Sequence, residues 1–305
     1  MPSFAPMPEP LYHYYQPAAA IRASGEDAFS FLQSQATQDL RRAQNNSGVY
    51  SLWLNHKGKV IGDSFAFRED EETLLLISLF TPAATLLPHW QKHIVADEVE
   101  LCDETGQWFG LACNDPAREL LADECGNAAA PRCALGLRDK TPWYELFWKD
   151  AIPMQYARGV LKRKGVEPLC ATAMELRRIY SGLPRVPVDL GDGDLPAEGG
   201  LVEDAISFTK GCFLGQEIVA RMHHVGRARR GLFRLRGNGT LPAALSPLLS
   251  SHSDKPVGDL RSGIQLAQGG WIGLAMCDLK KIQSVSKIKI QNQLAEILAK
   301  DGDIK

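Results

Sequence analysis

The pattern of apolar residues changes once along the chain. Up to about residue 230, helical and strand-like periodicities alternate, whereas beyond Arg230 only short strand-like runs remain, separated by Gly, Pro and Ser. Alternation of the first kind is typical of α+β domains, and a series of short strands is typical of a small β-barrel or sandwich. With 305 residues, two or three domains are expected. We place them at 1–105, at 106–228 and at 229–305, and the second domain could be discontinuous with the first.

The first of these domains is predicted to have the order βββαβ after an opening helix. Apolar residues at helical spacing predict that helix over 25–43, and the first seventeen residues, with five prolines, are expected to form an extended lead-in. The elements that follow are a hairpin around a glycine-containing turn (49–55 and 60–68), a strand (73–79), a helix that begins at Thr81-Pro82, and a strand (95–104).

The second domain repeats this rhythm more loosely. A strand over 108–114 precedes a helix opened by Asp115-Pro116, and the runs CALGLRD and WYELFWKD are strand-like. Helices are expected near 155–165 and over 171–181. The stretch 183–200 is rich in Pro, Gly and Asp and has no apolar period, which predicts a long loop of the kind that carries function.

Composition excludes several classes of protein. A net charge of −2 does not favour general binding to nucleic acid or anionic membranes, and no apolar run is long enough to span a bilayer. The N-terminus has no secretory pattern, so we expect a cytoplasmic protein. Seven cysteines without a CxxC pair do not support a zinc or iron–sulfur ligand set. We expect six of them to be reduced packing residues, with Cys212 as the exception.

Cys212 lies in the stretch KGCFLGQEIVAR, which begins at Lys210. Gly211 and Gly215 allow a tight turn and the close approach of a ligand, and QEIVARM after Gly215 has the composition of a short helix. A nearby lysine and a helix N-terminus both favour thiolate over thiol. Such a thiolate could act as a nucleophile, a redox centre or a transient metal ligand. The alternative is a packing cysteine in a glycine-lined loop.

This stretch strongly resembles the signature K-G-C-[FY]-x-G-Q-E-x-x-x-R of the YgfZ family, whose fold is similar to that of the T-protein of the glycine cleavage system. SGEDAFSFLQSQATQDL (24–40) resembles the family's N-terminal G-x-D-A-x-x-F-L-Q-x-x-x-T-x-D, and LNHKGK resembles its hairpin motif. The stretch from RRIYSGLPR to the cysteine resembles R-x-x-x-G-x-P followed by D and P-x-E. The match covers most of 20–235.

The resemblance implies two α+β domains and a β-barrel arranged in a ring around a central channel that holds tetrahydrofolate or a one-carbon derivative. It implies a folate-binding accessory protein for iron–sulfur cluster assembly or repair, which supports tRNA modification indirectly and has assembly factors or client proteins as partners. Cys212 would be the reactive group and Lys210 would lower its pKa. The residues expected to order the loop are Gly211, Gly215, Gln216, Glu217 and Arg221.

Three residues are candidates for holding the folate. Glu198 matches the family's P-x-E position, and its carboxylate could accept two N–H groups of the pteridine. Arg221 and Arg227 belong to a stretch, 221–236, with six arginines, two histidines and no acid, which could bind a polyglutamate tail. The same stretch could instead contact RNA phosphates, or be a solvated strand edge.

Two further alternatives follow from this reading. One is a folate-dependent one-carbon transferase or demethylase acting on a small amine. Glycine-cleavage activity itself is not expected, because the segment that corresponds to the acid-containing turn of T-proteins, 75–87, has no Asp or Glu. The other is an RNA-binding module that uses 221–236. A metal site is not expected, because the adjacent His223 and His224 rarely aim at one ion.

Overall fold

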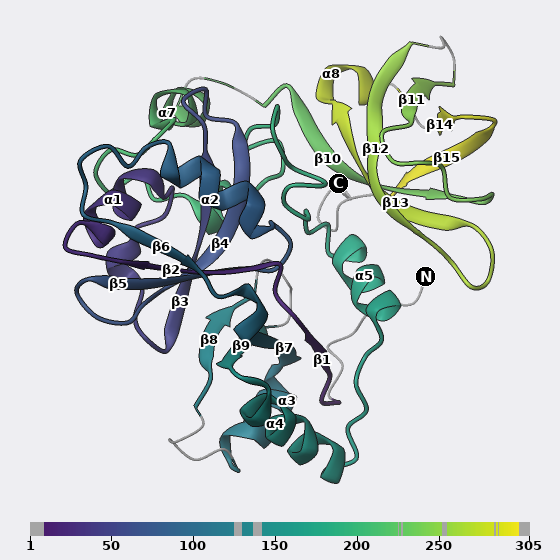
Figure 1. Cartoon of the computed structure of the whole chain (residues 1–305). Helices are drawn as coiled ribbons and strands as arrows, with labels where there is room; N and C mark the ends of the chain where they lie inside the picture. The colour runs from purple at the N-terminus through teal and green to yellow at the C-terminus, as the bar shows by residue number, and fades with distance from the viewer. Residues whose placement is uncertain are drawn as a thin grey trace. The chain divides into compact units, whose positions relative to one another are not determined.

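A computed structural model describes residues 9–124, 130–136, 142–224, 226, 228–251, 255–283, 285 and 287–298. The chain divides into two compact units, whose elements are labelled in Figure 1. Unit 1 consists of Met1–Leu54, Ile61–Ala171 and Asp204–Leu214, and unit 2 of Asn55–Val60, Thr172–Glu203 and Gly215–Lys305. Within the described ranges no helix combines the length and apolarity that a membrane span needs.

Unit 1 is built on a nine-stranded sheet with the order β1-β7-β9-β8-β3-β4-β5-β2-β6. Its strands are Tyr12–Tyr15 (β1), Ala19–Ser24 (β2), Ser47–Leu54 (β3), Val60–Arg68 (β4), Thr73–Ser78 (β5), Glu100–Asp103 (β6), Trp108–Asn114 (β7), Arg132–Leu135 (β8) and Trp143–Lys149 (β9). Its helices are Ala28–Gln35 (α1), Ala83–Gln91 (α2), Asp115–Ala122 (α3) and Ala151–Arg163 (α4), with 3₁₀ turns at Leu40–Arg42 (η1) and Thr105–Gln107 (η2).

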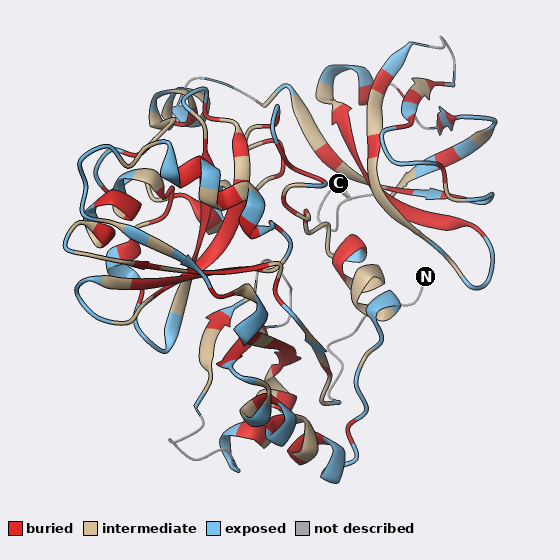
Figure 2. Ribbon diagram, in the orientation of Figure 1, coloured by how far each residue is buried: buried red, intermediate tan, exposed pale blue. Residues whose placement is uncertain are grey.

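Two apolar cores hold the helices on this sheet. α1 and α2 pack on β2, β4 and β5, where Trp53 and Trp90 are fully buried and meet edge to face with ring centroids 4.8 Å apart. α3 and α4 pack on β7 and β9 in a separate core around Leu111 and Leu146. Figure 2 shows the buried residues along these strands. The predicted α+β architecture is thereby confirmed.

Local side-chain bonds correct two predicted helix boundaries. The helix expected over 25–43 stops at Gln35, because Gln33 turns back to accept from Leu40 N and to donate to the Asp39 carboxylate. Polar side chains that bond nearby backbone compete in this way with helical hydrogen bonds. The cap of α3 is Asn114, one residue before the predicted cap, and its side chain accepts from the third residue of the helix.

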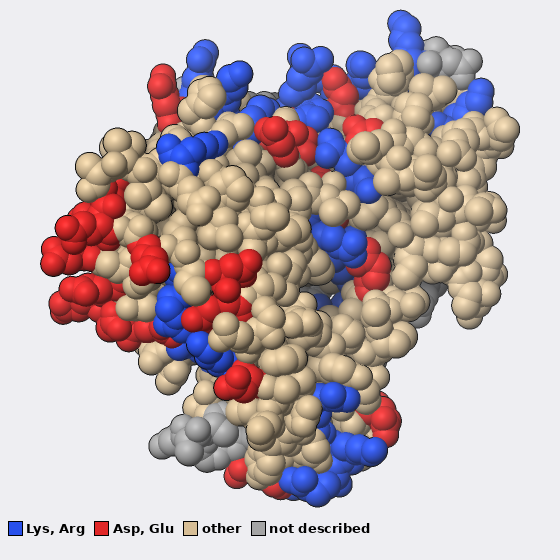
Figure 3. All heavy atoms as spheres, viewed as in Figure 1, with Lys and Arg blue, Asp and Glu red and all other residues tan. Residues whose placement is uncertain are grey.

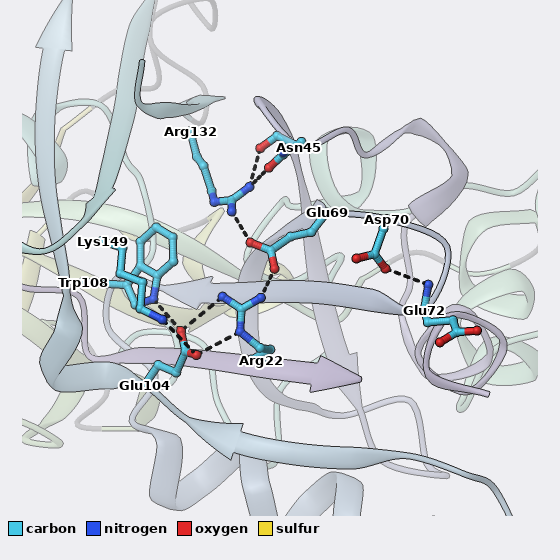
Figure 4. Close-up of polar contacts among 9 residues, drawn as sticks. All are labelled: Arg22, Asn45, Glu69, Asp70, Glu72, Glu104, Trp108, Arg132 and Lys149. Carbon is cyan, nitrogen blue, oxygen red and sulfur yellow. Dashed lines mark hydrogen bonds and ion pairs between the residues drawn. The ribbon is translucent and has the colours of Figure 1, made fainter. Parts of the chain in front are cut away.

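The two ends of the nine-stranded sheet are joined by side chains (Figure 4). Arg22 on β2 contacts the carboxylates of both Glu69 and Glu104, and Glu104 also accepts from Trp108 Nε1 on β7 at 3.0 Å and from Lys149 on β9 at 3.2 Å. Burial alone would raise the pKa of Glu104, but these hydrogen bonds outweigh it and lower the pKa to about 2. This closing network therefore depends on an ionised Glu104.

Unit 2 contains the predicted barrel, which is closed in the order β10-β13-β12-β11-β14-β15. Its strands are Arg230–Gly237 (β10), Pro247–Ser250 (β11), Pro256–Gln265 (β12), Trp271–Asp278 (β13), Lys287–Ile290 (β14) and Gln293–Leu298 (β15). The remaining helices are Ala171–Tyr180 (α5), Val202–Ala205 (α6), Gln216–His224 (α7) and Leu279–Ile282 (α8). Trp271, Leu235 and Ile288 lie in the barrel core.

We predict that Glu104→Gln lowers the free energy of unfolding by about 2 kcal/mol at neutral pH, because three donors lose a charged acceptor. The folded-state pKa lies below the usual 4.5, so the wild-type contribution is complete above that pH and is lost as the pH falls toward 2. Urea unfolding at several pH values measures both effects. Glu100→Gln, at an exposed position on β6, is the control and should change little; equal losses for both variants would contradict the prediction.

Candidate functional site

Lys210 is buried and bound to the end of a helix. Its ammonium donates to the carbonyl oxygens of Gln33, Ala36 and Gln38 at 2.5, 2.6 and 3.2 Å. These oxygens lie at the C-terminal end of α1, where carbonyls lack helical partners and the helix dipole favours a cation. Burial lowers the pKa of Lys210 to about 8, so the amine stays charged at neutral pH. Because an ammonium has three N–H donors, the end of α1 and the residues just after it use all of them.

The rest of the segment 204–214, which we call the motif segment, is bound to the same region. Thr37 donates its hydroxyl to the carbonyl of Ala205 at 2.6 Å, across 168 residues of sequence. Leu214 N donates to the carbonyl of Ser34 at 3.0 Å. The motif segment is therefore fixed at its start, its middle and its end, and these partners lie in the last turn of α1 or in the few residues that follow it.

Cys212 projects from the motif segment toward solvent. Its thiol and Gly211 are exposed, whereas Lys210 and Phe213 on either side are 6% exposed. The Lys210 ammonium lies 5.5 Å from the centroid of the Phe213 ring, within range of a cation–π contact, and open space surrounds Gly211. The thiol is thus presented between two buried anchors, which suits a reactive or metal-ligating group and not a packing residue.

The other cysteines divide into three groups. Cys113 and Cys277 are buried, Cys133 is half-buried, and Cys102 and Cys170 are exposed. The prediction that these were all packing residues is therefore wrong for the two exposed ones, and Cys125 lies outside the described residues. Exposed strand ends and connections can carry a small residue of any polarity, so composition alone does not separate them from the core.

Two glycines let the turn between β3 and β4 touch the start of α7 inside unit 2. Gly58 and Gly215 both have positive φ, at 68° and 81°, a conformation that favours glycine. A Cβ on Gly215 would lie 2.6 Å from Asn55 O and 2.9 Å from Gly58 Cα, and a Cβ on Gly58 would lie 3.1 Å from Ile218 Cβ. The tight turn predicted at Gly215 is present, and it requires glycine on both sides of the contact.

Glu198 lies in a different setting from the one predicted. It is 5% exposed, and it accepts from Arg230 at both oxygens, at 2.9 and 2.7 Å, and from Leu195 N at 2.8 Å. A carboxylate has about four acceptor positions, so roughly one remains. The paired N–H groups of a pteridine need two. As it lies, the carboxylate does not fit that recognition unless Arg230 releases one of its bonds.

Two further acids of the loop 183–200 are also paired with arginines inside unit 2. Asp189 binds Arg178 at 2.6 Å, and Asp194 binds Arg261 at 2.8 Å. Breaking a buried ion pair leaves one charge without compensation and costs about 3–5 kcal/mol. These carboxylates therefore hold the loop in place instead of forming an open acidic site.

The basic stretch 221–236 is used in two ways. Arg230 binds Glu198, and Arg234 donates to the Tyr180 carbonyl at 2.5 Å, so part of the stretch is internal. Its exposed arginines among the described residues are Arg221, Arg229 and Arg236. Arg227, predicted as a folate ligand, lies outside the described residues. The predicted short helix is present as α7, which places Arg221 on an exposed surface.

The remaining motif residues lie at the start of α7. Gln216 opens the helix, and Glu217 is exposed in its first turn, one turn before Arg221. Their assignment as loop-ordering residues stays a prediction. The ordering contacts that the structure does show come from Thr37 and from the end of α1. They lie within the motif Q-x-x-x-T-x-D, whose spacing is visible in the sequence, although its partner is not.

Comparisons with known proteins match this architecture. The model of the GCVT N-terminal domain family matches residues 16–135. The iron-sulfur cluster assembly factor IBA57, mitochondrial, of Mus musculus is 28% identical over 303 residues, which cover 92% of this chain and 81% of the relative. The tRNA-modifying protein YgfZ of Vibrio vulnificus strain YJ016 is 26% identical over 227 residues, which cover 71% and 67%.

A solved structure shows the same fold. The glycine cleavage system aminomethyltransferase T from Bartonella henselae superposes with a TM-score of 0.73 at 16% identity, over 95% of this chain and 85% of that one. At this identity the likeness concerns the fold alone. The GCVT-domain match and the relatives named IBA57 and YgfZ show that the chain is similar to the YgfZ/IBA57 proteins over most of its length.

Proposed function

We propose that this chain is an accessory factor for iron–sulfur cluster assembly or repair, with Cys212 as its reactive thiol. The observation that carries the proposal is the exposure of Cys212 on a segment whose neighbours, Lys210 and Phe213, are buried. The relatives named as an assembly factor and as a tRNA-modifying protein support the same role. Many tRNA-modifying enzymes need iron–sulfur clusters, so an effect on tRNA modification would follow indirectly.

The Cys212 thiol is exposed, whereas the motif segment that carries it is fixed by hydrogen bonds. A thiolate is the ligand that iron–sulfur clusters take from proteins, and an exposed one can bind an iron of a cluster in transit or exchange with a disulfide. Lys210 acts as a positioning residue in this proposal, because its three donors are bound to the end of α1 and to the residues just after it. Its charge holds the motif segment in the conformation that presents the thiol.

Tetrahydrofolate remains part of the proposal through the motif resemblance and the family. Glu198 could contribute one acceptor as it lies, or two after Arg230 releases a bond. Bound folate would supply a one-carbon carrier or a ligand that stabilises one conformation. We derive no chemical step from it.

Replacement of the thiol tests the central claim. In a host that lacks its own family member, we expect Cys212→Ser to restore less than about a tenth of the activity that the wild-type chain restores to an iron–sulfur dehydratase assayed in extracts. The reason is that a hydroxyl is a poor ligand for iron and cannot exchange with disulfides. Cys170→Ser, at another exposed cysteine, should rescue fully. Full rescue by Cys212→Ser would show that the thiol is dispensable.

Variants of Lys210 separate positioning from activation. We expect Lys210→Met to lower the free energy of unfolding by about 3 kcal/mol, since buried carbonyls lose a charged donor, while Lys210→Arg keeps part of it. The pH midpoint of Cys212 alkylation, followed by peptide mass spectrometry, should move by less than about half a unit. A midpoint that rises by about one unit or more, with stability unchanged, would instead identify Lys210 as the activator of the thiol.

Calorimetric titration with tetrahydrofolate tests the cofactor. We expect saturable binding that weakens about tenfold in Glu198→Gln, because the neutral amide removes the charge that faces both Arg230 and the ligand. Glu203→Gln, an exposed acid nearby in sequence, is the control. The absence of saturable binding to the wild-type chain would remove folate from the proposal and leave the role of Cys212 standing.

A further inference from the structure

Unit 2 contains a pocket between the loop that precedes α6 and one face of α7. Its volume is about 270 Å³, and its walls include Leu195, Pro196, Val202, Val219 and Met222. Val219 and Met222 are three residues apart and therefore share a face of the helix. Sites for small molecules usually have about 300–1,000 Å³ and several convergent polar groups. This pocket is smaller and mainly apolar, which suits a single large apolar side chain.

The pocket opens among exposed basic side chains. Arg221, His223 and His224 occupy the last turn of α7. Arg229, next to the lining residue Ala228, has a side chain that is 82% exposed and lies 3.6 Å from the Asp278 carboxylate. Glu203 is the one acid among the described lining residues. Figure 3 shows Lys and Arg side chains standing out along the upper edge of the view, where Figure 1 labels α7.

This basic character is local. Unit 1 carries the opposite charge at one end of its sheet, where exposed acids from three loops and from the start of β6 gather at the left of Figure 3. They are Glu26, Asp70, Glu71, Glu72, Asp97, Glu98 and Glu100. The net charge of the whole chain is only −2, so a charged partner would be directed to one surface and not to the molecule in general.

We propose that this pocket is a docking site for an acidic segment of a partner protein, which inserts one large apolar side chain between the loop and α7. Interfaces commonly concentrate their affinity in a buried apolar anchor, while surrounding charges set the rate of encounter and the choice of partner. The proposal goes beyond the proposed function, because docking here needs neither the thiol nor folate.

Two observations favour a protein over RNA as the occupant. The described lining residues include no Phe, Tyr or Trp, and His223 is their one aromatic ring, whereas recognition of single-stranded RNA depends largely on stacking several bases on aromatic rings. Apart from Glu203 and His223 the lining is apolar, and it includes the Met222 thioether, a flexible group that adapts to apolar partners.

The test uses the full chain and a phage-displayed library of random twelve-residue peptides. Selection on the wild-type chain is followed by depletion on Ala228→Phe, which fills the pocket, or on Ala197→Met if that variant fails to fold by circular dichroism. An enriched peptide is then synthesised and titrated into chain labelled with ¹³C-methyl methionine. The Met222 resonance is assigned with Met222→Leu.

We expect the enriched peptides to carry several acids around one Leu, Met, Phe or Trp, and to shift the Met222 methyl resonance saturably. Ala228→Phe should weaken binding at least about tenfold. Arg229→Glu should weaken it about threefold or more, with a smaller effect at high salt. Lys289→Glu, an equal charge reversal at an exposed position on β14, should bind as the wild type does. Cys212→Ser should bind normally, which separates this test from that of the thiol.

Three results would overturn the proposal. One is the absence of peptides enriched on the wild-type chain over Ala228→Phe. Another is equal binding by a peptide whose large apolar residue is replaced with alanine, which would leave charge as the whole effect. The third is an RNA twenty-mer that shifts the Met222 resonance more strongly than any selected peptide, which would assign the surface to nucleic acid.

Discussion

The Lys210 ammonium and its three carbonyl partners at the end of α1 determine how the motif segment is held. An uncompensated cation in a buried position is costly, so once Lys210 is placed there, the residues around it have little freedom. Gly211 and Cys212 must then turn outward, and Phe213 can return to the core. The exposure of the thiol is in this sense a consequence of the burial of the lysine.

Cationic side chains also hold other segments of the molecule in place, there by pairing with carboxylates. Arg22 joins two carboxylates across the ends of the sheet in unit 1, and Arg230 and Arg178 bind the acids of the loop 183–200 in unit 2. Arg22 and Arg230 connect segments that are far apart in the sequence, whereas Arg178 and Asp189 are 11 residues apart. Planar, bidentate pairing defines direction as well as distance, so such pairs can fix a loop that has no regular hydrogen-bond ladder of its own.

Much of the fold could be predicted from local patterns. The hairpin of β3 and β4, the helices α5 and α7 and the strand-rich barrel after Arg230 follow from periodicity and turn residues. The strands β1 and β2 were missed, because YHYY and the alanine-rich AAIRAS are short and become strands through pairing with β7, β5 and β6. The partners of Lys210 and Glu198 were also missed, since both depend on contacts that no local pattern encodes. Motif spacing therefore identified candidate residues without their hydrogen-bond partners, and the roles assigned to Lys210 and Glu198 stay predictions.

The close contact of Gly58 and Gly215 means that substitutions at these two distant positions in the sequence are coupled. A methyl group on either residue would push against the backbone of the other turn or against α7, so neither position is free to drift alone. A related sequence that has another residue in place of one glycine would need a compensating change in the turn that contacts it. Variation at these two sites, where it occurs, should therefore arrive as paired events.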